Sequence, residues 1–556
     1  MSQNSKNKKS RDMWKGKAIE RGTEVRACRK EIQRLRNERD RFKEEAKAAN
    51  AELAKRSNQA VACIEKKTDV VYLILSLFFF ARIGFRPIAR VLSVLGPYLG
   101  LLKTPCPQTV SNYVTRLSIA KMHTFVNSVG NANGGVAKKT VWLIDISIGL
   151  GSGKILSVLA LNIEHHQQNE YAPGLANVQC VATAVADSWN GETIADFLRN
   201  VIANVGFCPI AFLKDGGTDL EKAILLLNEQ GSSFECIADI SHKVANLFKH
   251  EYAQDPLFDT FISACGQVSK KLKQTMLACL APPKVSTKAR FMNLHRLVEW
   301  ADKLLKHVPP SGKYENPMLV KLRASLDQLP ACETFIKRFL RDAKPMLECQ
   351  KILKQKGLNL QTYAQCQKLI EVIPASSSIR IGFTDWAKSH LAIANKLQLN
   401  QIGLPISTDV LESLFGVGKR LGMGHVLDAN RISSHLPALC GTLTKQDAQD
   451  VVDITVAKHK EVIGCVDSLS RQRRYVLPNP GRLQSLANDS GQRHLVLIPS
   501  SVSRCEPPAK SVSVSALPNT TLPNFSKFGL LPWKMLSGAL SLGGEWLQRA
   551  KSWGKP

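Results

Sequence analysis

The central stretch of the chain, residues 140–240, constrains the fold most. In this stretch the spacing of apolar residues changes from the period of a helix to the pattern of buried strands. Short apolar runs are separated by glycine-rich or polar turns, and two amphipathic segments fall between the later runs. The order of elements is therefore strand, strand, strand, helix, strand, helix, strand. We predict strands at residues 141–146, 155–163, 178–186, 209–215 and 234–240, and helices at 192–205 and 219–229.

This order resembles that of RNase H-like domains, in which the first and fourth strands lie side by side. On that resemblance we expect an α+β, multi-domain protein whose catalytic core is a mixed sheet. Asp145 lies inside the first predicted strand, and Asp215 ends the fourth. Adjacent strands would bring these two carboxylates together.

Helical periodicity returns on both sides of the sheet region and predicts how the chain is divided. Prolines interrupt the helical stretch after residue 243 several times, and the composition after about residue 470 is rich in Ser, Pro and Asn. The predicted regions are a basic coiled coil at 1–67, a helix-turn-helix-like DNA-binding domain at 68–125, the first part of the catalytic core at 138–250, a long all-α insertion at 251–400, the final core helix at 401–445 and a largely disordered tail at 446–556.

The first 67 residues are basic, with 20 Lys or Arg against 10 Asp or Glu, and contain a seven-residue repeat. Apolar residues on the 3-4 spacing are Val25, Cys28, Ile32, Leu35, Phe42, Ala46, Ala49 and Leu53. Arg39 is the one polar residue in this seam. The pattern predicts a short coiled coil that dimerises the protein, and it is equally compatible with a lone, solvated basic helix.

A helix-turn-helix is predicted ahead of the sheet region. One helical face spans residues 85–95, Gly96 and Pro97 break it, and a second helix restarts at Pro107. Polar residues expected on the outer face of the second helix are Gln108, Thr109, Ser111, Asn112, Thr115 and Arg116. Such side chains bind base edges and phosphates when a helix lies in the major groove, although a plain helical bundle would show the same pattern.

The charge of the chain points to a polyanionic partner. There are 75 Lys or Arg against 46 Asp or Glu, giving a net charge of +29. Double-stranded DNA is the expected partner, ahead of general solubility or an anionic membrane surface. The apolar run at 70–81 is too short to span a bilayer and predicts a buried helix. Fourteen cysteines without a CxxC pair predict reduced, buried thiols in a cytoplasmic protein. With DNA as its partner, the protein is expected to be nucleoid-associated.

A third carboxylate is expected on a helix after the last strand, because phosphodiester chemistry with two divalent cations needs about three carboxylates from different elements. Glu412 opens an apolar helix in the segment 405–424, and Lys419 follows two turns later on the same face. The alternative is that Asp409 and Glu412 only form a capping box at the start of this helix.

Together these residues resemble the DDE-type DNA transposases of bacterial insertion sequences. The resemblance rests on Asp145 with a glycine hairpin after its strand, on Asp215 in the form Lys-Asp-Gly-Gly, and on Glu412 with a lysine at +7. In addition, Asp239-Ile-Ser-His242 resembles the Cys/Asp-x-x-His motif of the hAT and Mutator-like superfamilies. The resemblance covers residues 85–430 and is strongest in the core.

The resemblance implies roles for individual residues. Asp145, Asp215 and Glu412 would bind Mg²⁺, or Mn²⁺ in its place, and carry out catalysis. Lys419 and Arg420 would contact DNA, while Asp239 and His242 would support the site. His242 is equally compatible with a satisfied core histidine. Related enzymes stack an aromatic side chain on a flipped base, for which Trp300 and Trp386 are candidates, with core packing the favoured alternative.

The expected function is Mg²⁺-dependent hydrolysis of phosphodiesters at the ends of a mobile element, followed by transfer of the freed strand into target DNA. Bringing two ends together implies a homodimer or a larger oligomer. Two alternatives remain: a non-catalytic DNA-binding or regulatory protein of the same fold, and a nuclease that cuts without joining.

Overall fold

The computed structural model defines the path of most of the chain. It describes residues 3–56, 67–101, 103–130, 139–148, 153–164, 171–285, 290–308, 311, 316–421, 428–463, 466, 481 and 494–499. The glycine hairpin predicted at 149–153 lies outside these residues, apart from Gly153.

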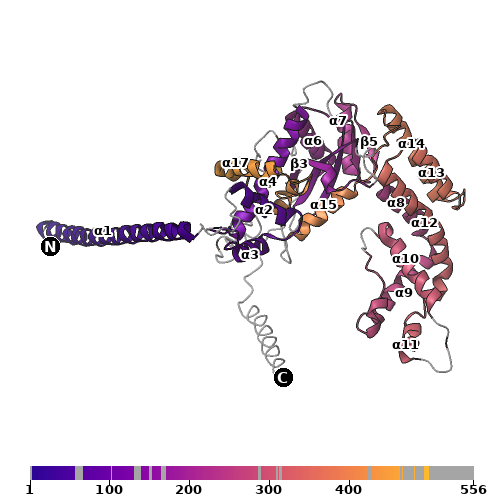
Figure 1. The fold of residues 1–556 in the computed structure, drawn as a ribbon, viewed down its shortest axis with the longest axis horizontal. Coiled ribbons are helices and arrows are strands. Elements are labelled where there is room, and N and C mark those ends of the chain that lie inside the picture. Colours follow the sequence, from indigo (N-terminus) through magenta and orange to yellow (C-terminus); the bar gives the residue numbers. More distant parts are fainter. Residues whose placement is uncertain are drawn as a thin grey trace. The chain divides into compact units, whose positions relative to one another are not determined.

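One mixed sheet forms the centre of the α+β fold (Figure 1). Its strands are β1 (Thr140–Ile148), β2 (Lys154–Asn162), β3 (Val178–Ala186), β4 (Ala211–Lys214), β5 (Glu235–Ala238) and β6 (Val496–Leu497), in the spatial order β5-β4-β1-β2-β3-β6. β1 runs parallel to β4 and antiparallel to β2, and β4 runs parallel to β5. The five predicted strands and the adjacency of the first and fourth are confirmed, whereas β6, antiparallel to β3, was not predicted.

The sheet separates two hydrophobic cores because successive side chains on a strand point to opposite faces. On β1, Trp142 and Ile144 belong to one core, and Val141 and Leu143 to the other. Helices α6 (Gly191–Val205) and α7 (Thr218–Glu229) cover the face of Trp142 through their apolar sides. Both helices were predicted, and Asn190 caps the first by accepting a hydrogen bond from the Thr193 N–H.

The opposite face of the sheet carries the helix on which Glu412 lies. Helix α15 (Asp409–Arg420) packs against β1, and the short α16 (Ala429–Ser433) packs against β2 and β3. Leu411 and Leu414 are fully buried there, while the other side of α15 faces solvent. This amphipathic pattern is what fixes which side chains of α15 can reach the sheet.

Between β5 and α15, all of the described secondary-structure elements are helices. The helices are α8 (Ile240–Tyr252), α9 (Pro256–Leu272), α10 (Arg290–His307), α11 (Pro317–Ser325), α12 (Glu333–Lys356), α13 (Leu360–Ile370) and α14 (Ser378–Lys396), with two short 3₁₀ turns. A cluster of aromatic rings that includes Tyr252, Phe335 and Phe339 joins α8 to α12. The predicted helical character of this region is confirmed.

The helices before the sheet pack onto it. They are α2 (Lys67–Phe79), α3 (Phe85–Leu95) and α4 (Pro107–Gly130). α4 contacts α2, α3 and β3. Val71, Ile74 and Phe78 are buried, so the apolar run at 70–81 forms a core helix as predicted. None of the described helices combines the length and apolar character needed to cross a bilayer.

The N-terminal segment is a single helix, α1 (Gln3–Arg56). The apolar residues of its predicted seam are exposed to solvent, as shown by Val25, Leu35 and Phe42, which are 50–57% exposed. The side chains of Ala49 and Leu53 lie outside those described.

The prediction of a largely disordered tail from residue 446 is wrong for its first part. Residues Lys445–Asp453 form α17 and Val456–Ile463 form α18. α17 packs against α2 and α4, with Ala448 and Val451 buried. Thr444 and Asp447 cap its start reciprocally. The polar composition of residues 445–453 gave no clear sign of α17, a short amphipathic helix that completes the core around α4. Most of the tail beyond 466 lies outside the described residues.

The cysteines in the described part of the chain are free. Several are buried, as expected, but Cys28, Cys106, Cys208 and Cys279 are exposed. The predicted burial is therefore wrong for these four cysteines.

Candidate functional site

Asp145 lies on β1, on the face that α15 covers. It shares that face with Val141 and Leu143 because side chains alternate along a strand. Its Oδ1 accepts a hydrogen bond from the Ile146 N–H at 2.6 Å. Burial, followed by the nearby negative charge of Asp215, raises the pKa of Asp145 to about 7. The carboxylate is thus held where its charged form is poorly compensated.

Asp215 follows β4 directly and lies next to Asp145. The parallel register pairs Ile144 with Lys214, so the two aspartates occupy the next corresponding positions. Oδ1 of Asp215 accepts a hydrogen bond from the Gly217 N–H at 2.9 Å. A Cβ added at Gly217 would lie only 2.9 Å from this oxygen, which explains the glycine. The buried Lys214 ammonium donates to the Asp215 carbonyl and to Glu221.

Glu412 extends from the first turn of α15 and is exposed. The capping-box alternative does not hold, because the N-cap residue of α15 is Thr408 and Asp409 is already the first residue of the helix. Asp409 instead binds the Ser241 hydroxyl and the Lys354 ammonium. Although the side chain is in contact with solvent, desolvation by the surrounding protein, followed by the charge of Asp409, raises the pKa of Glu412. Its carboxylate is left available, since no hydrogen bond engages it among the described residues.

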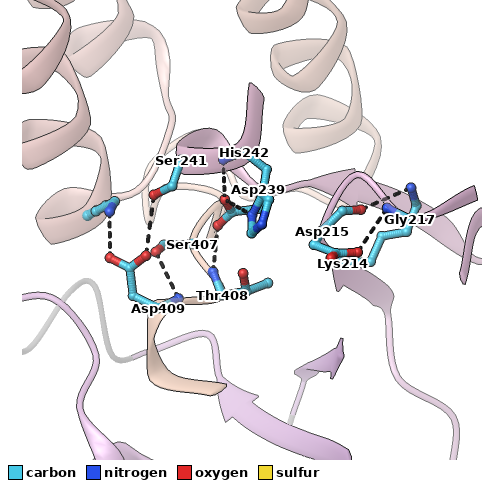
Figure 2. A network of polar contacts seen from close by, with 10 residues as sticks. Lys214, Asp215, Gly217, Asp239, Ser241, His242, Ser407, Thr408 and Asp409 are labelled. Atoms are coloured by element: carbon cyan, nitrogen blue, oxygen red, sulfur yellow. Dashed lines mark hydrogen bonds and ion pairs between the residues drawn. The ribbon is translucent and has the colours of Figure 1, made fainter. Parts of the chain in front are cut away.

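Asp239 ties the sheet to the start of α15, as Figure 2 shows. The side chain is fully buried between β5 and α8. Its Oδ1 accepts from the His242 N–H at 2.8 Å, and its Oδ2 accepts from the Thr408 N–H at 2.7 Å. Burial would raise the pKa of Asp239, but hydrogen bonds from His242 and Thr408 outweigh it and leave the pKa lowered. Thr408 immediately precedes α15, so Asp239 fixes where that helix begins.

His242 is half-buried beside the carboxylates and is not a core histidine. Its Nδ1 lies 3.0 Å from Oδ1 of Asp239. This hydrogen bond, opposed by burial and assisted by the charges of Asp239, Asp215 and Glu412, raises the pKa of His242 to about 9. The imidazole is therefore a cation at neutral pH, facing the acidic side chains.

Lys419 reaches from the last turn of α15 to the end of β1. Its Nζ donates to the Ser147 hydroxyl at 2.7 Å, two residues beyond Asp145. Partial burial lowers the pKa of Lys419, and the charge of Asp145 opposes that shift. Arg420, the next residue, is exposed. α15 thus carries an acidic residue in its first turn and two cations in its last turn, and Lys419 reaches the strand of Asp145.

The three predicted ligands converge on one region without forming a compact metal site. Asp145 is influenced by the charges of both Asp215 and Glu412, so all three carboxylates share one electrostatic environment. In the part of the chain that the structure describes, however, no group of three His, Cys, Asp or Glu side chains is close enough to hold one metal ion. Asp145 and Asp215 match a hard divalent cation in donor type and in their mutual repulsion. Glu412 acts on Asp145 through its charge, but the three carboxylates do not share one coordination shell.

The predicted DNA-reading face of α4 is only partly open. Gln108 is exposed and donates to Asn112, while Thr109, Ser111, Asn112 and Arg116 are half-buried. Thr115 is 3% exposed, so its predicted outward orientation is wrong. The cause is packing on more than one side, since α4 also contacts α17 and α18. Within residues 107–116, only Pro107 and Gln108 at the start of the helix are exposed.

A cavity beside Glu412 was missed at the sequence level. It has a volume of about 330 Å³ and lies between α8, α10, α12 and the start of α15. Its walls include Phe248, Phe291, Phe339, Arg296 and Lys354. Trp386 is buried and the Trp300 indole donates to the Leu280 carbonyl, and neither side chain lines the cavity. The residues that surround it come from helices far apart in the chain.

No protein-family model matches this chain, and no curated protein sequence matches it.

Proposed function

We propose that this chain is a metal-dependent DNA transposase with an RNase H-like core and an all-helical insertion. The observation that carries the proposal is the convergence of Asp145, Asp215 and Glu412 on one face of the mixed sheet. They come from β1, from the end of β4 and from α15, and Asp145 has a pKa of about 7 in their company. Carboxylates in mutual repulsion are a common feature of sites that bind cations or perform acid–base chemistry.

Asp145 and Asp215 would hold Mg²⁺ or Mn²⁺, with Glu412 completing the site. Such a metal pair activates the attacking oxygen and stabilises the leaving oxygen of a phosphodiester. Asp239 acts indirectly by fixing the start of α15 and hence the position of Glu412. Bringing the three carboxylates into a shared shell requires a movement of the exposed Glu412 side chain.

DNA would approach from the side of the cations. Lys419 lies next to the carboxylates and Arg420 beside it, so both can contact a phosphate close to the reacting bond. The chain carries a net charge of +29, which favours a polyanion over the whole surface. We assign recognition of element ends to the accessible beginning of α4, at Gln108 and its neighbours.

The cavity beside Glu412 suits an unpaired base. Three phenylalanine rings line it and Arg296 lies at its wall, which are the apolar and cationic partners that a displaced base uses. This role replaces the one considered for Trp300 and Trp386, whose rings are packed elsewhere.

A second candidate function is DNA binding without catalysis. The observation that favours it is the lack, in the described residues, of three side chains close enough to share a metal. The two candidates differ in one measurable property, which is metal-dependent cleavage.

The test is a strand-nicking assay with the full chain and DNA fragments that flank its coding sequence, in Mg²⁺ or Mn²⁺. We expect nicked products and then strand-transfer products. Asp215→Asn should lower the rate at least about a hundredfold, as expected for a ligand of the catalytic metals. The matched control is Asp219→Asn, an exposed carboxylate four residues away, which should leave the rate unchanged. Nicking by Asp215→Asn at the wild-type rate would refute the catalytic proposal, and nicking without joining would indicate a nuclease.

A further inference from the structure

Helix α1 presents an apolar seam with no partner among the described residues. In heptad notation, Val25, Ile32, Arg39 and Ala46 occupy the a positions, and Cys28, Leu35 and Phe42 occupy the d positions. Val25, Ile32 and Leu35 are each 50–51% exposed, and Phe42 is 57% exposed. Large apolar side chains repeated along one stripe are costly to leave in water, which favours burial against another helix.

The two flanks of this seam carry opposite charges. The g positions, on one flank, are Glu24, Glu31, Glu38 and Glu45. The e positions, on the other flank, are Arg29, Arg36 and Lys43. Within the described chain, Glu31 and Glu38 pair with Arg34, and Glu45 pairs with Arg41. No ion pair engages Arg29, Arg36 or Lys43 in that same part of the chain.

We propose that α1 binds α1 of a second copy as a parallel, in-register, two-stranded coiled coil. In a parallel pair, each g residue faces the e residue of the following heptad on the other helix. Glu24 then meets Arg29, Glu31 meets Arg36, and Glu38 meets Lys43. Each contact occurs twice by symmetry, so every cation of the e flank gains an acidic partner.

The charges exclude the antiparallel arrangement. In that orientation g faces g and e faces e, so glutamates would face glutamates and cations would face cations. The same feature makes the seam self-complementary only when the two chains run in the same direction. A parallel pair also releases both chains from the coil at the same end.

Arg39 sets the register. As the one charged residue at an a position, it meets its own copy when the helices are in register, and both side chains can extend toward solvent. A shift by one heptad would place each arginine against Ile32 or Ala46 and would lose one g–e contact at each end. A single polar a residue commonly fixes register in this way, at some cost in stability.

Site-specific cross-linking of the full chain tests orientation and register. Cys28 lies at a d position and is exposed, so mild oxidation should join two chains through it. Cys28→Ser should abolish that bond, and adding Ala46→Cys to this variant should restore a cross-link at a second layer. The control is Ala27→Cys in the same background, because position 27 faces away from the seam. An antiparallel pair cannot bring both layer 28 and layer 46 into self-contact, so failure at either position overturns the proposal.

Charge reversal tests the flanking pairs. The double variant Glu31→Lys and Glu38→Lys places like charges across both flanks, as does Arg36→Glu with Lys43→Glu. Each alone should dimerise about tenfold more weakly in light-scattering measurements, and an equimolar mixture should recover a heterodimer of wild-type strength. Wild-type protein that is monomeric at micromolar concentration, or variants that dimerise as well as wild type, would overturn the proposal. The readout is association, so it is independent of whether the chain cleaves DNA.

Discussion

Removing the charge of Asp145 should stabilise the protein in the absence of metal. Burial and the charge of Asp215 raise the pKa of Asp145 from 3.8 to about 7. Because one pKa unit corresponds to about 1.4 kcal/mol, the upper bound for the penalty on the ionised form is about 4 kcal/mol. The side chain is only partly buried and water can rearrange around it, so we expect about 1–3 kcal/mol.

The pH dependence of this effect has a definite sign. A carboxyl group with a raised pKa in the folded state contributes its full stability below pH 4 and loses it as pH rises to about 7. Asp145→Asn keeps the size of the side chain and its acceptor for the Ile146 N–H but does not ionise. The difference in melting temperature between Asp145→Asn and wild type should therefore grow by roughly 3–8 °C, in favour of the variant, from pH 5 to pH 8.

The assay is thermal unfolding of the full chain in EDTA at the two pH values, with Asp219→Asn as the control for loss of a surface carboxylate. Groups that titrate elsewhere are common to all three proteins and cancel in the comparison. Adding Mn²⁺ should then stabilise wild type and not Asp145→Asn. If Asp145→Asn is no more stable than wild type at pH 8, the charge repulsion inferred for this site does not exist.

Three further outcomes follow from single contacts. Asp239→Asn weakens the hydrogen bonds to Thr408 and His242, and we expect it to lower the melting temperature by several degrees. Because Glu412 is then less well placed, the cleavage rate of the folded protein should also fall. A cleavage rate equal to that of wild type, after correction for the folded fraction, would contradict this role. Gly217→Ala should reduce Mn²⁺ binding because its Cβ would displace the Asp215 carboxylate. The control is Gly231→Ala, whose added Cβ would meet no atom within 4 Å, and which should affect only stability. A Mn²⁺ affinity in Gly217→Ala equal to that of wild type would count against the proposed geometry. Burial lowers the pKa of His435 to about 3, so stability should fall by up to about 1.4 kcal/mol per pH unit as pH drops below 6.5, and His435→Gln should reduce that slope in acid unfolding experiments; an unchanged slope would show that this histidine is not buried in its neutral form.

The strands and the sequence positions of the acidic residues could be predicted because they depend on local patterns. Short apolar runs bounded by turns located β1 to β5 within a few residues, and Asp145 and Asp215 stand at recognisable points of that pattern. The hydrogen bond from the Thr408 N–H to Asp239 could not be predicted, since it joins residues 169 positions apart through a backbone group.

Other features escaped prediction because tertiary packing determines them. Thr115 has the polarity of a surface residue but is buried where α17 and α18 cover α4. β6 is only two residues long and gains its conformation by pairing with Thr183 and Ala184 on β3. The cavity beside Glu412 depends on how four helices meet, which no periodicity encodes.

The central claim is that carboxylates on one face of the sheet bind a divalent cation. Its most direct test is titration of the full chain with Mn²⁺, following the loss of the free-ion signal by electron paramagnetic resonance. We expect wild type to bind Mn²⁺ and Asp215→Asn to bind at least about tenfold more weakly, with Asp219→Asn unchanged. Equal Mn²⁺ affinity in wild type and Asp215→Asn would contradict the account.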